Sequence, residues 1–130
     1  MLFRSSIAAH EEAKRIFDFT VGVVHQAYSR LVEMGVQPED ARYLLPNATE
    51  TKVIITMNAR ELLHFFRLRC CERAQWEIRD MAVGMLKLAK QVAPTIFQTA
   101  GPGCLAGPCP EGEFCCGRTA QVRKQFRSLV

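Results

Sequence analysis

The feature that most constrains the fold is a long stripe of apolar or small side chains near the start of the chain. They recur in steps of three and four residues, at Ala9, Ala13, Ile16, Thr20, Val23, Ala27, Leu31 and Met34. This period is that of one face of an α-helix. Glu11 and Glu12 stand in the early turns, where the helix dipole favours negative charge, and Gly35 follows as a stop signal. The pattern predicts one long helix that ends just before Gly35.

Two shorter elements are predicted after this helix. In the segment PEDARYLLP, Pro38 at a first helical position and the acidic residues behind it indicate a short helix that Pro46 ends. Residues 51–57, TKVIITM, are rich in β-branched side chains and apolar on both faces, which is typical of a buried strand. No pairing partner is evident, so we expect this strand to pair with another chain or with a weakly signalled segment.

Two further helices are expected between residues 58 and 93. Asn58, with Glu61 three residues later, resembles a capping box and is the predicted N-cap of the helix ARELLHFFRLR. Apolar residues cover most of its circumference, so we expect it to be buried nearly all round. A second helix is predicted from about Arg73 to Ala93, before Pro94. Its expected inner stripe consists of Ala74, Ile78, Met81, Met85, Leu88 and Val92.

Four of the six cysteines lie in residues 101–117, a segment whose five Gly and three Pro predict a loop. Their spacing lacks the C-x2-C pairs of the usual zinc sites, so we expect no metal and interpret them as free thiols, with zinc as the weaker alternative. These cysteines are Cys104, Cys109, Cys115 and Cys116. Cys70 and Cys71 are interpreted as residues of a helix bend, because no arrangement that would activate a nucleophile accompanies them in sequence.

Size and charge fit one globular domain with a single core. The 130 residues are 48% hydrophobic and 23% charged. No apolar stretch approaches the ~20 residues of a membrane helix, and the first ten residues lack a cleavable leader pattern, so we expect a cytoplasmic protein in a reducing compartment. The excess positive charge follows Gly117, and residues 118–130 are interpreted as a basic tail. Nucleic acid is not the expected partner, because no groove-reading motif accompanies this charge.

Several arginines stand inside otherwise apolar segments. A guanidinium group stays charged when it is buried, so it needs an anion or several acceptors. The candidate cluster consists of Arg42, Asn58, Arg60, His64 and Arg69. One interpretation is internal ion pairing, for which the available acids include Glu61, Glu72 and Glu77. The other is a site for a phosphate-bearing or otherwise anionic ligand, assisted by the N-terminus of the helix that follows Asn58.

The segment from Met57 to Ala82, MNARELLHFFRLRCCERAQWEIRDMA, resembles the C-terminal signature of the flavin-dependent thymidylate synthases. It contains an N-A-R helix start, an L-R doublet and an A-Q-W-E-I run in the family's order. The flanking strings DARYLLP and GPCPEGEFCCG are similar to neighbouring segments of the same family, so the resemblance extends over about residues 10–117. It implies a methyltransferase of dTMP biosynthesis.

The resemblance also implies cofactors and residue roles. The family converts dUMP to dTMP with a methylene group from methylenetetrahydrofolate and a hydride from FAD that NADPH has reduced. The positions that correspond to FAD contacts are Asn58, Ala59, Arg60 and His64, and those that hold dUMP are Arg42 and Arg69. Arg69 is assigned the catalytic role of promoting ionisation at N3 of the uracil ring. A fixed guanidinium would stabilise negative charge on the pyrimidine imide and raise the electron density at C5.

One hallmark of the family, an Arg-His-Arg triplet followed by Ser-x-Asn-Glu and Ser-x-Arg, does not occur in this sequence. We therefore interpret residues 1–117 as the C-terminal part of such a domain. The expected fold is α+β, mainly α in this chain, with long helices packed around one strand of a sheet that is completed elsewhere. Because the family's active sites lie at the interfaces of a homotetramer, the expected partner is a further copy or a separate N-terminal half. The alternative is a catalytically incomplete fragment that binds nucleotide or flavin or serves in assembly.

Overall fold

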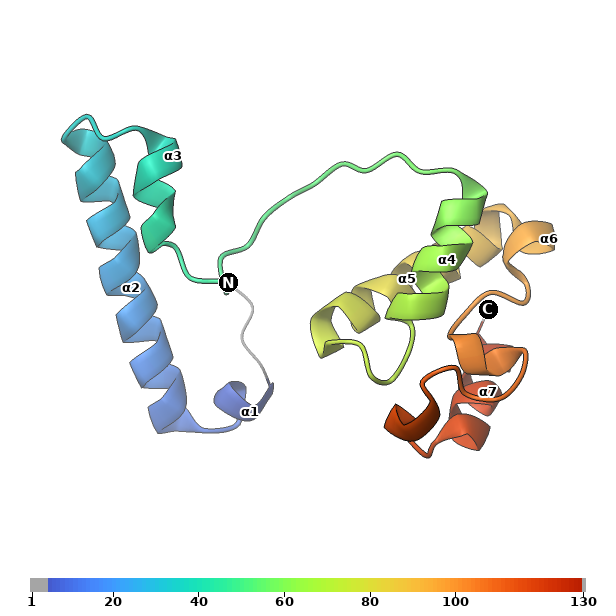
Figure 1. The fold of residues 1–130 in the computed structure, drawn as a ribbon. Coiled ribbons are helices and arrows are strands. Elements are labelled where there is room, and N and C mark those ends of the chain that lie inside the picture. The colour runs from blue at the N-terminus through green and yellow to red at the C-terminus, as the bar shows by residue number, and fades with distance from the viewer. Residues whose placement is uncertain (1–4, 130) are drawn as a thin grey trace. The chain divides into compact units, whose positions relative to one another are not determined.

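The computed structural model describes residues 5–129, which form helices joined by loops (Figure 1). The chain divides into two compact units that meet in sequence between Ile54 and Ile55. The first unit holds the long helix, and the second holds the helix with most of the candidate residues and the cysteine-rich loop. Across the described residues, no helix combines the length and the apolar character that a membrane crossing requires.

The first unit contains α1 (Ser5–Ala8), α2 (Glu11–Glu33), α3 (Pro38–Ala41) and the 3-10 helix η1 (Arg42–Leu44). α2 confirms the predicted long helix, and Gly35 is confirmed as its stop. Gly35 has φ +87°, and its N–H donates to the carbonyl of Val32 at 3.0 Å. The N–H of Val36 donates to the carbonyl of Leu31 at 3.0 Å, which completes a Schellman motif. Glycine suits this position because a Cβ disfavours left-handed backbone.

α3 and η1 confirm the short helix predicted between Pro38 and Pro46. Pro38 lies in the first turn of α3, and Ala41 is buried. Both elements contact α2. None of the residues of α2 is buried, however, and Ile16 and Val23 of its apolar stripe are exposed.

The strand predicted for residues 51–57 is wrong. These residues take up no regular structure, and Ile54 is 100% exposed. Residues 5–129 contain no strand, so the predicted α+β fold, with helices packed around a sheet, is also wrong: the described chain is helical. The physical reason is that β-propensity reflects side-chain packing on a paired, half-buried surface. A lone segment of β-branched residues does not supply that surface.

The second unit contains four α-helices and two 3-10 turns: α4 (Ala59–Arg69), α5 (Trp76–Val92), α6 (Pro94–Phe97), η2 (Gly103–Leu105), η3 (Gly112–Phe114) and α7 (Thr119–Arg127). α4 and α5 confirm the two predicted helices. α5 begins later than predicted because Gln75 caps it, with Oε1 accepting from the N–H groups of Glu77 at 3.0 Å and Ile78 at 3.1 Å. Pro94 opens α6 and so marks the limit of α5, as predicted.

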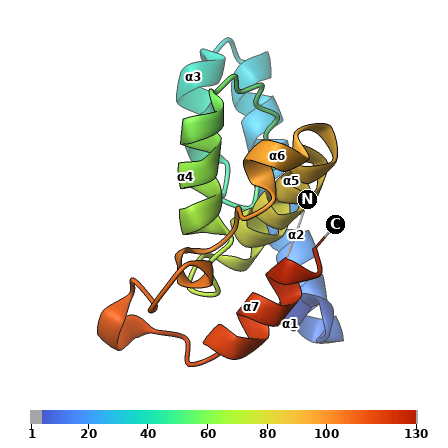
Figure 2. The ribbon, with the colours of Figure 1, turned by 90° about the vertical axis from the view of Figure 1, so that its right-hand side faces the viewer.

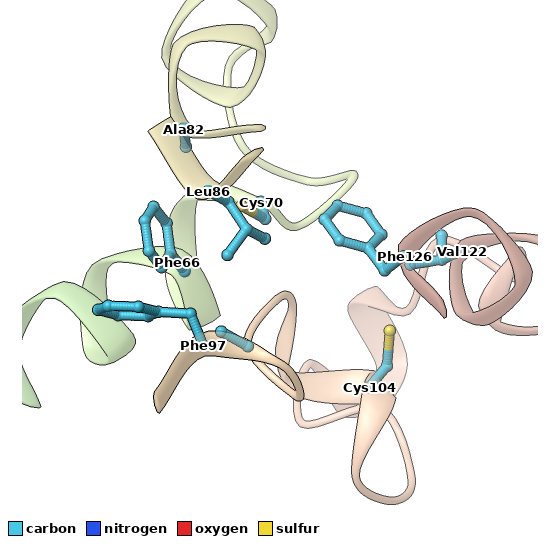
Figure 3. Close-up of a cluster of buried hydrophobic side chains, with 9 residues drawn as sticks. Phe66, Cys70, Ala82, Leu86, Phe97, Cys104, Val122 and Phe126 are labelled. Atoms are coloured by element: carbon cyan, nitrogen blue, oxygen red, sulfur yellow. The ribbon is translucent and has the colours of Figure 1, made fainter. Parts of the chain in front are cut away.

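The core of the second unit is a cluster of buried side chains from α4, α5, α6 and α7 (Figure 3). Phe66 and Phe97 meet edge to face, with ring centroids 6.0 Å apart, which is a favourable aromatic geometry. Leu86 of α5 is fully buried, and Val122 and Phe126 bring α7 into the same cluster. Figures 1 and 2 show α4 lying against α5. The core thereby fixes the surface that α4 leaves exposed.

The expectation that α4 is buried nearly all round is wrong. Phe66 is its buried residue, whereas Arg60, His64 and Leu68 are exposed. Neighbouring elements cover one side of α4, and the apolar side chains away from that side are partly or fully exposed to solvent.

The predicted inner stripe of α5 is wrong in part, although its member Met85 packs against the core. The buried residues of this helix are Ala82 and Leu86. The predicted stripe members Met81, Leu88 and Val92 are exposed. α5 carries apolar side chains on two adjacent faces, and the positions of α4, α6 and α7 determine which face is covered.

Residues 101–117 form the predicted loop, which contains only the short turns η2 and η3. The segment interpreted as a basic tail contains α7, which is anchored in the core by Val122 and Phe126. Arg123 of α7 donates from Nε to the carbonyl of Cys104 at 2.9 Å and from Nη2 to the carbonyl of Gly107 at 2.6 Å. The positive charge of Arg123 therefore helps to hold the loop in place. Val130, the last residue of this segment, lies outside the described residues.

Candidate functional site

The N-terminus of α4 is defined by Asn58. Its backbone is extended, and its Oδ1 accepts a hydrogen bond from the N–H of Glu61 at 2.9 Å. This bond satisfies one of the amides that have no partner within the helix. The predicted N-cap is confirmed, and the positive end of the helix dipole begins at Ala59.

Arg60 and His64 lie next to each other on the surface of α4. They are four residues apart, which places them one turn apart on the same face, and both are exposed. Arg60 also stands in the first turn, where the helix dipole favours an anion. A guanidinium, an imidazole and a helix N-terminus are thus presented together, as the sequence predicted from their spacing.

Arg69 occupies a different position on the same helix. It is the last residue of α4 and is exposed. With 3.6 residues per turn, nine residues after Arg60 correspond to the opposite side of the helix, about 13 Å further along the axis. α4 therefore carries three exposed arginines, Arg60 in its first turn and Arg67 and Arg69 in its last turn.

Arg42 belongs to the other unit. It opens η1 and is exposed. Its membership of a common site with the residues of α4 stays a prediction.

Internal ion pairing of the candidate residues is not found within residues 5–129. The side chains of Arg42, Arg60, His64 and Arg69 form no hydrogen bond or salt bridge in that range. Glu72, one of the acids that could have paired with them, instead forms salt bridges with Arg79, whose Nη1 lies 3.4 Å from Oε2 of Glu72, and with Arg118. The cationic groups of α4 remain accessible to an external anion.

The donor chemistry of α4 fits the two ligands that the sequence resemblance implies. A guanidinium donates paired hydrogen bonds to phosphate oxygens or to an ionised imide, and both FAD and dUMP carry phosphate groups. An exposed helix face does not exclude water, so a working site needs further walls around these residues.

A second group of reactive side chains was missed by the sequence analysis. Cys71, from the turn after α4, lines the same small cavity as Cys104, Cys109 and Cys116 of the loop. The cavity has a volume of about 10 Å³, which is room for about one water-sized sphere. Spacing within the loop could not reveal this group, because Cys71 precedes Cys104 by 33 residues. The sequence signal was the presence of cysteine in both segments.

The other two cysteines have different surroundings. Cys70 is fully buried in the core, and burial raises the pKa of its thiol from 9.0 to about 12. The pKa of Cys115 lies below its ordinary value because the N–H of Gly117 donates to its Sγ at 3.5 Å, with further hydrogen bonds to Cys109 and Thr119. Cys70 is thus a packing residue, and Cys115 is the loop thiol whose thiolate is favoured.

A family profile and curated proteins from several organisms match this chain. The profile of the family described as Thymidylate synthase complementing protein matches residues 1–95. The flavin-dependent thymidylate synthase of Geobacter sulfurreducens is 60% identical over 124 residues, which cover 95% of this chain and 53% of that protein. The protein of the same name from Clostridium tetani is 46% identical over 128 residues, covering 92% and 50%. The chain spans about half the length of these curated relatives.

Proposed function

Because the chain belongs to the family of thymidylate synthase complementing proteins, whose curated relatives are flavin-dependent thymidylate synthases, we propose that it forms part of such an enzyme. The observation that carries this proposal is the accessible cationic surface of α4. Arg60, His64 and Arg69 are exposed and lack internal partners within the described residues. The complete reaction converts dUMP, methylenetetrahydrofolate, NADPH and a proton to dTMP, tetrahydrofolate and NADP+.

Arg69 is the residue to which we assign the chemistry of the nucleotide. Its guanidinium is permanently charged and donates to the uracil imide while N3 gives up its proton to water. The negative charge then spreads to C5, where the new carbon–carbon bond forms and from which the displaced hydrogen leaves as a proton. Removing a preorganised donor of this kind typically lowers the rate about 10²- to 10³-fold. No thiol nucleophile is needed for this step.

The N-terminal half of α4 is assigned to the flavin. Asn58 and Ala59 set the start of the helix, and Arg60 and His64 offer charged or polar contacts beside it. FAD, when bound, carries the hydride that NADPH supplies. The role of these four residues is to bind and orient that cofactor. Hydrogen bonds from charged donors to its phosphate groups would supply part of the binding energy.

Arg42 is assigned to the phosphate of dUMP, and its contribution requires that the first unit reaches the same site. The chain spans about half of its relatives, so we propose that another polypeptide segment or further copies, in a homotetramer, supply the remaining walls. We place the protein in the cytoplasm, where dUMP, reduced folate and NADPH are available.

The test is release of deuterium from dUMP labelled at C5, in the presence of FAD, NADPH and methylenetetrahydrofolate. The 130-residue chain is assayed alone and after co-expression with the half of the Geobacter sulfurreducens relative that it does not match. Arg69→Ala is compared with Arg127→Ala, which removes an exposed arginine of α7 far along the sequence. Far-UV circular dichroism confirms that both variants fold.

We expect release from the co-expressed assembly, a loss of about 10²-fold or more in Arg69→Ala, and no comparable loss in Arg127→Ala. Unchanged turnover in folded Arg69→Ala would remove its catalytic assignment. Turnover by the chain alone would support the proposed enzymatic activity. It would refute the proposal that a second polypeptide segment is required. Binding of dUMP or FAD without any deuterium release in either preparation would favour a binding or assembly role over the enzyme.

A further inference from the structure

The cysteine cavity of the second unit is not used by the proposed reaction. It is bordered by four thiols from three separate stretches of chain: Cys71 in the turn after α4, Cys104 in η2, and Cys109 and Cys116 in the loop around η3. Cys104 also belongs to the buried cluster drawn in Figure 3, together with Val122 and Phe126 of α7. Four cysteines that line one cavity supply the residue types of a structural zinc centre.

The backbone around the cavity is closely packed, which brings these cysteines near one another. A Cβ built at Gly103 would lie 2.8 Å from Cγ of Pro110, so the chain next to Cys104 touches the chain next to Cys109. The same Cβ would lie 3.4 Å from Nε of Arg67, one turn before Cys71. Arg123 holds the loop from the other side through the carbonyls of Cys104 and Gly107.

The charges near the cavity suit a thiolate-bound divalent ion. Four thiolates and one divalent cation carry a net charge of −2. Arg67, Glu72 and Glu111 line the cavity, and Arg123 bonds to the backbone of Cys104. Glu72 is paired with Arg79 and Arg118, so the two guanidinium groups of Arg67 and Arg123 stay available to offset the negative charge. A divalent ion would itself favour the thiolate form, because a coordinating thiol loses its proton.

We propose that Cys71, Cys104, Cys109 and Cys116 bind one Zn²⁺ ion that fastens the loop 101–117 to the turn after α4. Zinc is the ion that tetrahedral all-sulfur sites favour, and its bonds to sulfur are about 2.3 Å long. The second unit is small and has a long loop with few buried side chains, which is the setting in which structural metals occur. This zinc site is independent of the proposed catalytic role of α4.

The thiols border the cavity without yet converging on one point. Within the described residues, no group of three or more His, Cys, Asp or Glu side chains is placed so that it could hold a metal ion without side-chain movement. Protonated thiols attract one another only weakly, so no strong interaction draws their sulfur atoms together in the absence of a cation. A change of the cysteine χ1 angle between staggered rotamers moves Sγ by about 3 Å, and the energy of zinc–thiolate bonding supports such a movement.

This assignment gives the neighbouring cysteines Cys115 and Cys116 different roles. Cys116 lines the cavity, whereas Cys115 does not; the sulfur of Cys115 bonds with Gly117 and Thr119 and also with Cys109. Cys115→Ser is therefore a matched control for Cys116→Ser, because the two substitutions are chemically identical and one residue apart. Cys109→Ser adds a second ligand change.

The experiment measures metal content by plasma emission in the full chain, expressed with zinc, kept reduced and freed of excess metal by gel filtration. We expect about one zinc per chain in the unsubstituted protein and in Cys115→Ser, and near-complete loss in Cys116→Ser and Cys109→Ser. Zinc binding does not depend on dUMP, folate or flavin, so its result is separate from the test of enzymatic activity.

Three results would overturn the proposal: no bound zinc, iron in its place, or equal zinc loss from Cys115→Ser and Cys116→Ser. A fourth such result would be disulfides among these cysteines instead of a bound metal. Alkylation under non-reducing conditions followed by mass spectrometry detects them. If the ligand variants do not fold, Co²⁺ is added to the unsubstituted metal-free chain. Sulfur-to-cobalt charge-transfer bands with tetrahedral d–d absorption support the site, and their absence refutes it.

Discussion

Leu86 and Leu88 of α5 offer a direct test of which face of that helix is covered. The helical period in the sequence places Leu88 on the inner stripe, but in the structure Leu88 is 63% exposed and Leu86 is 0% exposed. Both are leucines in the interior of one helix, so replacing either by alanine changes helix propensity by the same small amount. The difference between Leu86→Ala and Leu88→Ala therefore isolates burial.

The expected magnitudes differ clearly. Leu86→Ala removes a fully buried side chain beside Phe66 and Phe97 and leaves a cavity, which costs about 2–5 kcal/mol. Leu88 has about a third of its surface covered, so its truncation costs below about 1 kcal/mol. For a unit of this size, each 1 kcal/mol corresponds to a shift in Tm of about 4–8 °C.

Unfolding in urea, followed by tryptophan fluorescence, measures this difference. The chain has a single tryptophan, Trp76, at the start of α5, so the signal reports on the second unit. Leu86→Ala should lower the urea midpoint by about 1–2 M or abolish the transition, and Leu88→Ala should shift it much less. A larger loss in Leu88→Ala than in Leu86→Ala would refute the packing of α5 described here.

Two further predictions concern helix ends and glycines. Asn58→Ala should destabilise the second unit by about 1 kcal/mol in the same fluorescence assay, because the hydrogen bond from the N–H of Glu61 is lost. Asn58→Asp keeps an acceptor at this position and should retain most of the stability. Equal stability of the two variants would contradict the cap. In the first unit, Gly35→Ala should lower the thermal midpoint seen by circular dichroism, at a cost of about 1 kcal/mol, because φ is +87° there. Gly22→Ala, inside α2 with nothing within 4 Å of the new Cβ, should raise that midpoint, and a shift of the same sign in both variants would argue against the motif at Gly35.

The candidate residues of α4 divide into features that the sequence could predict and features that it could not. The cap at Asn58 and the shared face of Arg60 and His64 follow from spacings of three and four residues, which any α-helix reproduces. The lack of internal ion pairs could not be predicted, because Glu72 had several arginines available to it. The structure pairs it with Arg79 and Arg118, which come from α5 and the segment before α7.

The cysteines show the same division over a longer range. Within residues 101–117 their spacing matches no common zinc motif, and the interpretation as free thiols followed from that fact. The structure adds Cys71, which reaches the cavity only because α4 ends beside the loop. A donor set drawn from distant segments is a property of the fold, and local spacing does not contain it.

By itself the sequence determined the local elements of this protein: the long helix up to Gly35, the cap at Asn58, the limit at Pro94 and the loop after residue 100. These depend on backbone conformation and on contacts within a few residues, so periodicity and capping chemistry suffice. Only the tertiary structure decided that residues 51–57 form no strand, that Leu86 is buried and Leu88 is exposed, and that four cysteines surround one cavity. Each of these depends on which segments lie nearby, because burial and strand pairing are properties of neighbours in space.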